Sequence, residues 1–210
     1  MKNEMRQHHH RTLADLIEHA ALGPVPAKAA DTRGQVRRVL RVGDIPDVLG
    51  HVLAISEDDE HCEMFPDTPA LERGTVEVGD VVLVARGARP KVGLVGSASE
   101  GAVASANLMV LRPKEGILLG AVLAWWLDSP QGADALGRAN RSSMVGIPSL
   151  SVKDVLRLVV PVPSRDMQDA LATLLTAASE AASAERLAAT RRQDLARALA
   201  HRALFAVDAA

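Results

Sequence analysis

The spacing of small and apolar residues in the last quarter of the chain predicts one long helix. The stretch from Arg165 to Phe205 contains no Gly or Pro and is rich in residues that favour helices. At 1.5 Å per residue, a helix of roughly 40 residues is about 60 Å long, which is more than the preceding residues could cover. Small or apolar side chains recur in near-heptad spacing at Met167, Leu171, Leu174, Ala178, Ala181, Ala188, Leu195 and Leu199.

The charges of this helix favour antiparallel pairing. Its first half is acidic and its second half is basic, so antiparallel copies would place opposite charges together, whereas parallel copies would oppose like charges. The acidic residues are Asp166, Asp169, Glu180 and Glu185; the basic ones are Arg186, Arg191, Arg192, Arg197 and Arg202. There are two alternatives to pairing between copies. The helix could fold back on its own domain, or it could pair with a helix of another protein. We expect dimerisation or partner contacts at Leu171, Leu174, Ala178, Ala181, Leu195 and Leu199.

The residues before the long helix mix strand and helix patterns. β-Branched runs predict strands near residues 36–42, a hairpin within residues 75–95, a strand at 103–113 and one ending in the prolines of residues 158–163. Helical patterns cover residues 12–17, with Thr12 and Asp15 in capping-box-like spacing, and 117–137, and another begins at Ser151. The acidic segment 57–74 is expected to be a loop. We therefore predict an α+β fold with a mixed globular domain at residues 1–163 and one long coiled-coil helix at 164–210.

Composition limits the chemistry that the chain can perform. The 210 residues carry a net charge of −2, one Cys and no Tyr. The single Cys is consistent with a reducing cytoplasm, and no apolar run reaches the ~20 residues of a membrane span. Nucleotide-hydrolysis, serine-hydrolase and zinc-protease motifs are missing, and the histidines and acidic loop residues do not form a convincing metal site. These features favour a binding protein over an enzyme.

Basic and amide side chains on predicted loops are the candidate nucleic-acid contacts. Three cations cluster in the hairpin connection ARGARPK, which is either a solvated turn or a reader of phosphate and guanine. Polar loops elsewhere supply an amide, a hydroxyl and further cations, and one strand carries a basic edge suited to phosphates. The predicted DNA-binding residues are Arg86, Arg89, Lys91, Asn107, Arg138, Arg141 and Ser142, with Arg37, Arg38 and Arg41 on phosphates.

Short motifs in a fixed order give the chain a family resemblance. They are LADL at 13–16, VGDI at 42–45, VGDVVL at 78–83, RG at 86–87, NLMVLR at 107–112, LAWWLDSPQG at 123–132, GIPSLS at 146–151 and LVVPVP at 158–163. Gln168 and Leu204-Phe205 follow at the start and end of the long helix. Together these resemble the target-recognition domain and helix of type I restriction–modification specificity subunits.

The resemblance implies a non-catalytic DNA-recognition subunit of a phage-defence system. Members of that family usually carry two recognition domains and two long helices, whereas this sequence has one of each. It therefore looks like a half-size subunit that pairs head to tail as a homodimer or with a second half-subunit. The implied partners are double-stranded DNA, a methyltransferase subunit that brings S-adenosylmethionine, and optionally a motor and nuclease subunit. The alternative is a stand-alone DNA-binding or adaptor protein with the same domain.

Overall fold

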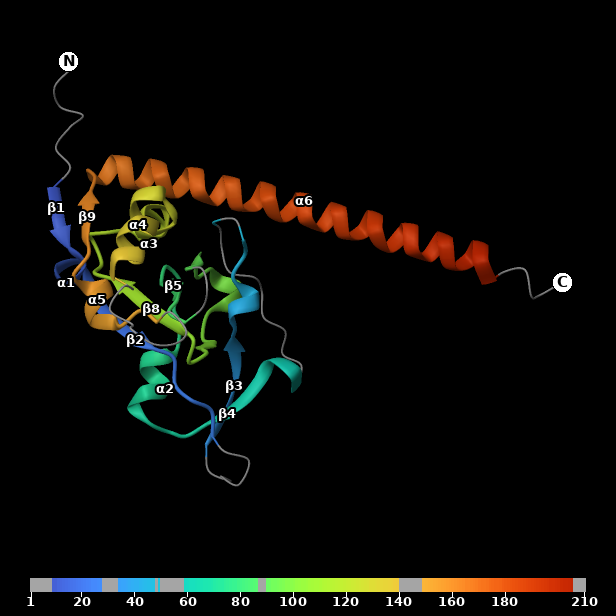
Figure 1. Cartoon of the computed structure of the whole chain (residues 1–210), viewed down its shortest axis with the longest axis horizontal. Helices are drawn as coiled ribbons and strands as arrows, with labels where there is room; N and C mark the ends of the chain where they lie inside the picture. The colour runs from blue at the N-terminus through green and yellow to red at the C-terminus, as the bar shows by residue number, and fades with distance from the viewer. Residues whose placement is uncertain are drawn as a thin grey trace, which may run out of the picture.

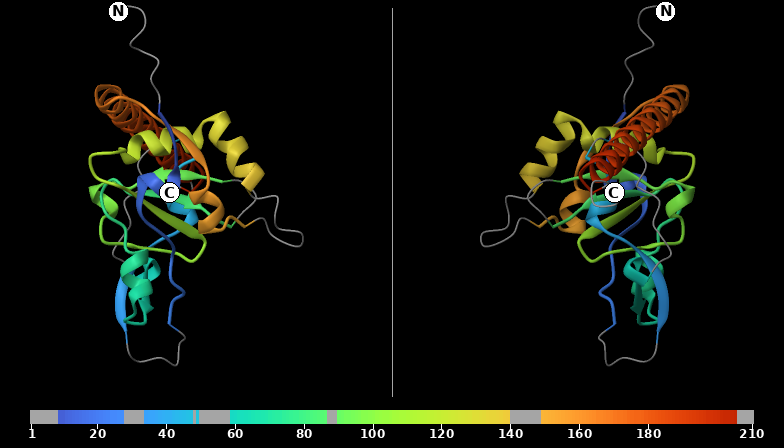
Figure 2. Two further views of the ribbon diagram at one scale, coloured as in Figure 1. Left: turned by 90° about the vertical axis from the view of Figure 1, so that its left-hand side faces the viewer. Right: turned by 90° about the vertical axis from the view of Figure 1, so that its right-hand side faces the viewer.

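The computed structural model describes residues 9–27, 34–47, 49, 59–86, 90–139 and 149–205. They form an α+β domain from which one long C-terminal helix projects (Figure 1). The domain and the helix confirm the predicted fold class. The helix starts at the top of the domain and continues well past it (Figure 1), and the two end views of Figure 2 look nearly along its axis.

The central sheet is antiparallel, with the strand order β2-β8-β5-β6. Its strands are β2 (Ile17–Leu22), β8 (Leu108–Pro113), β5 (Val81–Val84) and β6 (Val92–Leu94). Strand β5 is buried along its whole length because both faces of the sheet are covered. Alternate residues enter two different cores, so that Val81 and Leu83 pack beneath the helices while Val82 and Val84 face a second layer. The predicted hairpin of β5 and β6 is confirmed.

A smaller sheet with the order β4-β3-β7 forms the second layer. It contains β3 (Gln35–Leu40), β4 (Cys62–Phe65) and β7 (Val103–Ala104), with β3 antiparallel to β4 and parallel to β7. Short 3₁₀ turns at Val42–Asp44, Asp59–His61 and Ser97–Ser99 join these elements.

Two predictions in this region were wrong. The acidic segment is not all loop, because it holds β4 and helix α2 (Pro69–Gly74), whose Phe65 and Leu71 are buried against β3 and β7. The single strand expected at residues 103–113 is two strands in different sheets. The Leu108 amide donates to the Ser105 carbonyl at 2.9 Å and closes a turn between them.

Helices cover the other face of the central sheet. They are α1 (Leu13–Leu16), α3 (Gly120–Asp128), α4 (Pro130–Ala139) and α5 (Val152–Leu156), beside a two-stranded ribbon of β1 (His9–Thr12) and β9 (Val159–Val162). The helical pattern at residues 117–137 corresponds to two helices, α3 and α4, divided at Ser129, whose hydroxyl accepts from the Gly132 amide at 3.1 Å. A Cβ at Gly132 would lie 2.0 Å from the Trp126 carbonyl oxygen, so the α3–α4 corner requires glycine there.

Side-chain caps form at one predicted helix start but not at the other. The Ser151 hydroxyl accepts from the Asp154 amide at 3.1 Å and caps α5, as its sequence predicts. At α1, Thr12 makes no cap bond and instead donates to the Asp15 carboxylate at 2.6 Å. The short α1 therefore depends on the burial of Leu13 and Leu16.

The long helix α6 (Arg165–Phe205, 41 residues) is fixed to the domain through its first turns. Gln168 is 3% exposed; its side-chain oxygen accepts from the Leu119 amide at 2.8 Å, and its nitrogen donates to the carbonyls of Ile117 and Pro163, each at 3.1 Å. Leu175 is also buried. Every residue from 189 to 204 is exposed, so the domain leaves the distal part of the helix uncovered.

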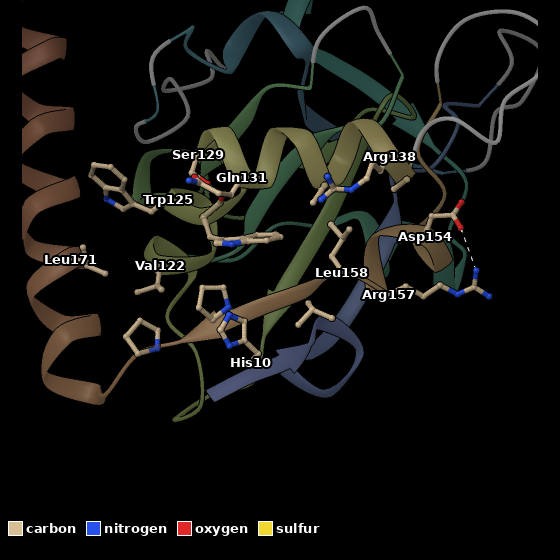
Figure 3. A pocket seen from close by; sticks show the side chains of 16 residues that line it. His10, Val122, Trp125, Ser129, Gln131, Arg138, Asp154, Arg157, Leu158 and Leu171 are labelled. Atoms are coloured by element: carbon tan, nitrogen blue, oxygen red, sulfur yellow. Dashed lines mark hydrogen bonds and ion pairs between the residues drawn. The ribbon is translucent and has the colours of Figure 1, made fainter. Parts of the chain in front are cut away.

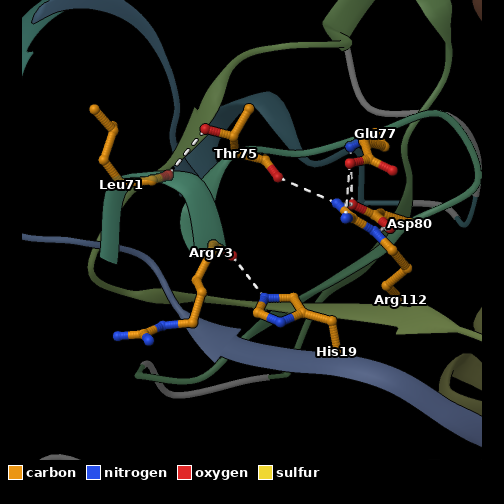
Figure 4. Close-up of polar contacts among 7 residues, drawn as sticks. All are labelled: His19, Leu71, Arg73, Thr75, Glu77, Asp80 and Arg112. Atoms are coloured by element: carbon orange, nitrogen blue, oxygen red, sulfur yellow. Dashed lines mark hydrogen bonds and ion pairs between the residues drawn. The ribbon is translucent and has the colours of Figure 1, made fainter. Parts of the chain in front are cut away.

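A buried ion pair lies where β5 begins and β8 ends (Figure 4). Asp80, which is 1% exposed, accepts from the Arg112 guanidinium twice, each at 2.9 Å, and from the Glu77 amide at 2.8 Å. Arg112 also contacts the Glu77 carboxylate at 2.7 Å and the Thr75 carbonyl at 3.3 Å. The bonds to Asp80 raise the pKa of Arg112. This network ties the end of β8, an inner strand of the central sheet, to the segment that precedes β5.

Removing the guanidinium should destabilise the domain strongly. In Arg112→Met the Asp80 carboxylate stays buried without its cation, and we expect a loss of about 3 kcal/mol in the free energy of unfolding, near the low end for a broken buried pair. Arg138→Met, which breaks an exposed pair with Asp134, should cost under about 1 kcal/mol. Urea unfolding compares the two variants, and equal losses would contradict this role of the network.

A second prediction concerns the anchor of α6. Gln168→Leu keeps the helix but leaves the Leu119 amide and two carbonyls without their partner, so the free energy of unfolding should fall by about 1–3 kcal/mol. Gln193→Leu, at an exposed position of the same helix, is the matched control. A loss confined to Gln168→Leu in urea unfolding supports the anchor; no difference between the variants refutes it.

Candidate nucleic-acid interface

Three of the predicted DNA-binding residues meet at one end of the central sheet. Arg86 follows β5, Lys91 precedes β6 and Asn107 precedes β8. Backbone bonds hold the three segments together: the Ala85 amide donates to the Asn107 carbonyl at 2.8 Å, and the Val84 amide donates to the Lys91 carbonyl at 2.9 Å. Three neighbouring segments of the backbone therefore carry two cations and an amide at the same end of the sheet.

Arg86 is exposed at this sheet end. Its backbone pairs with Ser149 in an isolated bridge, and the next residue, Leu150, donates its amide to the Ala85 carbonyl at 2.8 Å. Among the described residues Arg86 forms no ion pair. Its charge is thus not neutralised by the part of the chain that the structure describes. The predicted residues Arg89, Arg141 and Ser142 lie outside the described residues.

Lys91 is held by an acidic neighbour. Its ammonium lies 2.6 Å from the carboxylate of Asp47, which follows the 3₁₀ turn after β3. Lys91 lowers the pKa of Asp47, and the more distant charge of Arg186 on α6 lowers it further. A phosphate binding here would compete with Asp47 for the Lys91 ammonium.

The basic edge of β3 uses its guanidinium groups within the domain. Arg37 donates to the Gly101 carbonyl and Arg38 to the Glu100 carbonyl, both at 2.9 Å, while Arg41 pairs with Glu63 at 2.9 Å. These bonds fasten β3 to its neighbours, a role that the sequence did not reveal. A guanidinium has five N–H donors, so the bonds leave donors available for phosphate oxygens.

Arg138 lies on α4 and lines a cleft rather than the sheet end. It pairs with Asp134 one turn earlier in the helix. The cleft, of about 1020 Å³, lies between α3, α4, α5, β9 and the base of α6 (Figure 3). Trp125, Trp126, Pro161, Pro163 and Leu171 form much of its apolar wall.

The cleft was not predicted from the sequence. Its tandem tryptophans come from α3, where Trp125 is 37% exposed and Trp126 is half-buried. The local sequence gives no signal for the cleft, because four consecutive earlier residues of the same helix, Ala121 to Ala124, are all buried in one core. At the end of α3, burial raises the pKa of Asp128.

The predicted pairing face of α6 is largely exposed. Leu174, Leu195 and Leu199 are 55%, 61% and 58% exposed, and they recur along the predicted seam and are not scattered singly over the surface. Ala178 and Ala181 are exposed as well. Leu171 differs, because it packs against the domain core and lines the cleft.

Two kinds of site are missing from the described part of the chain. No group of three or more His, Cys, Asp or Glu residues there could hold a metal ion. None of the helices described is both long enough and apolar enough to cross a membrane.

Comparisons with known proteins identify the fold. No family model and no curated protein sequence matches the chain. Solved structures do match: the HsdS subunit of Thermoanaerobacter tengcongensis at a TM-score of 0.55 and 18% identity, over 93% of this chain and 47% of that one. The type I restriction–modification S subunit of M. genitalium matches at a TM-score of 0.58 and 17% identity, over 100% and 48%.

A third match comes from a study of complex assembly and conformational transition in the type I restriction–modification system. Its TM-score is 0.55 and its identity 18%, over 97% of this chain and 50% of that one. The chain thus spans about half the length of the solved structures that it matches. Its fold is that of type I restriction–modification S subunits, as the sequence motifs predicted.

Proposed function

We propose that the chain is the DNA-recognition subunit of a type I restriction–modification system, directing an adenine methyltransferase to a bipartite site. One observation carries the proposal. The whole chain shares the fold of S subunits while spanning about half of their length, and its long helix keeps an uncovered apolar face. A second chain of the same kind would supply the other half.

The sheet end offers the chemistry of a base reader. An arginine can bind the O6 and N7 of guanine with two bonds, and an asparagine can bind adenine in the same way. Arg86 and Asn107 present these two groups on adjacent segments, and Lys91 beside them suits a phosphate. The phosphate contacts would set the position of the domain on the duplex, while Arg86 and Asn107 would select the sequence.

Pairing through α6 would set the distance between two such readers. In an antiparallel dimer the recognition domains lie at opposite ends of a rod of about 60 Å, which spans between one and two turns of B-DNA. Each domain reads one part of the target, and the DNA between them is not read. Two identical chains related by a twofold axis imply a palindromic target.

Catalysis in this proposal belongs to the partners. A methyltransferase subunit brings S-adenosylmethionine and the adenine-methylating site, and a motor and nuclease subunit joins where the system also cleaves. The chain itself contributes recognition and spacing and acts in the cytoplasm.

Methylome mapping tests the function directly. In cells that carry the gene, adenine methylation should occur at a split, palindromic motif, and deleting the gene should abolish methylation of that motif alone. An unchanged methylome after deletion would contradict the proposal and favour a stand-alone DNA-binding or adaptor protein.

A variant at the sheet end tests which residues read the bases. Arg86→Ala should remove about 1–3 kcal/mol of discrimination between the mapped motif and a copy with one guanine replaced. Arg73→Ala removes an exposed arginine from α2, whose backbone contacts His19 near the opposite end of β8, and should leave discrimination unchanged. Competition binding measured by fluorescence anisotropy gives the ratio of the dissociation constants for the mapped motif and for the altered copy. Equal discrimination by Arg86→Ala and the wild type would remove Arg86 from the reading surface.

A further inference from the structure

The exposed apolar positions of α6 define the register in which a second helix can pack. Met167, Leu174 and Leu195 are 42%, 55% and 61% exposed and are separated by multiples of seven residues. Ala181 and Ala188 occupy the intervening positions. An antiparallel pair that is symmetric about Ala181 places Met167 opposite Leu195 of the second copy. This register buries all the residues of the seam.

The register leaves the end of the helix without a helical partner. With Ala181 at the centre, Arg197 of one copy lies opposite Arg165 of the other, where the partner helix begins, so residues 198–205 extend about two turns beyond it. With the centre moved to Ser183, which pairs Met167 with Leu199, residues 202–205 still extend about one turn beyond it.

The tryptophan cleft lies where these turns arrive. Residues that face the domain, such as Gln168 and Leu175, lie on one side of α6, and Leu171 lies between that side and the seam. At about 100° per residue, Met167 and Leu174 are only about 40–60° around the helix from Leu171. Since Leu171 and Trp125 both line the cleft, it opens on the flank of α6 that carries the seam (Figure 3).

Size and charge also suit this occupant. Leu199 and Leu204 are 58% and 72% exposed, and the apolar part of the cleft could cover both. Antiparallel pairing brings the arginines of the last turns, including Arg202, to the end of the rod where Asp166 begins the partner helix, beside the Arg165–Asp169 pair. Opposite charges therefore meet beside the apolar contact.

We propose that residues 199–204 of a second copy seat in the cleft formed by Trp125, Trp126, Pro161 and Pro163. The inference rests on the antiparallel dimer of the proposed function and adds an interface to it. Each recognition domain is then held at two places, by its own α6 through Gln168 and by the end of its partner's α6. The second contact fixes how the domain is oriented on the rod.

Trp125 and Trp126 are the two tryptophans of the chain, so their fluorescence reports on the cleft alone. As the concentration rises through dimerisation, acrylamide quenching should fall by about twofold, because the docked turns exclude solvent. In Leu204→Glu the quenching should stay at its monomer value, or the dimer should weaken. Leu187→Glu, at a 52% exposed position away from the docked turns, should behave like the wild type.

Sedimentation equilibrium on the same samples separates the possible failures. A wild-type dimer with unchanged tryptophan quenching would overturn the cleft contact and leave the dimer standing. Equal effects of Leu204→Glu and Leu187→Glu would also overturn it. A chain that stays monomeric would overturn both the contact and the dimer, whereas a failure of DNA recognition would be detected separately by the methylome.

Discussion

The arrangement depends on the rigid attachment of the first turns of a 41-residue helix to the recognition domain. Gln168 joins the first turn of α6 to the start of α3 and to the strand that leads into the helix. Because these bonds are buried, the direction of the helix is set by the domain. Its distal half is exposed to solvent and carries leucines that a folded chain normally covers. Association through that face would join two domains in a defined orientation.

The two ends of the central sheet have different roles: one stabilises the domain and the other carries the candidate recognition residues. At one end, the buried Asp80–Arg112 pair and its hydrogen bonds tie β5 and β8 together. At the other, Arg86 and Asn107 emerge from the same two strands, and Asn107 lies in an exposed turn. Since both faces of β5 are buried, the strands cannot shift relative to one another without uncovering a core. The exposed residues Arg86 and Asn107 are therefore attached to strands whose positions are fixed, as recognition requires.

Local patterns in the sequence predicted much of this structure. The long helix, the β5–β6 hairpin and the start of a helix at Ser151 depend on residues close together in the chain, and all three are confirmed. The roles of Phe65 and Leu71 were missed, because their burial comes from contacts with β3 and β7 that lie far away in the sequence.

The site was predicted less completely for the same reason. Sequence analysis selected Arg86, Lys91 and Asn107 individually, but only the strand pairing shows that they are neighbours. It could not show that Arg37 and Arg38 bind backbone carbonyls, since Gly101 and Glu100 lie more than 60 residues away. Nor could it show the cleft beside Trp125, which several separate elements build.

Small-angle X-ray scattering of the purified chain tests the central claim most directly, namely that α6 joins two recognition domains at its opposite ends. The account predicts a particle of twice the 22.2 kDa chain mass, with a two-lobed distribution of interatomic distances. A particle of 22.2 kDa with a single lobe, at concentrations of tens of micromolar and with the helix intact by circular dichroism, would contradict it.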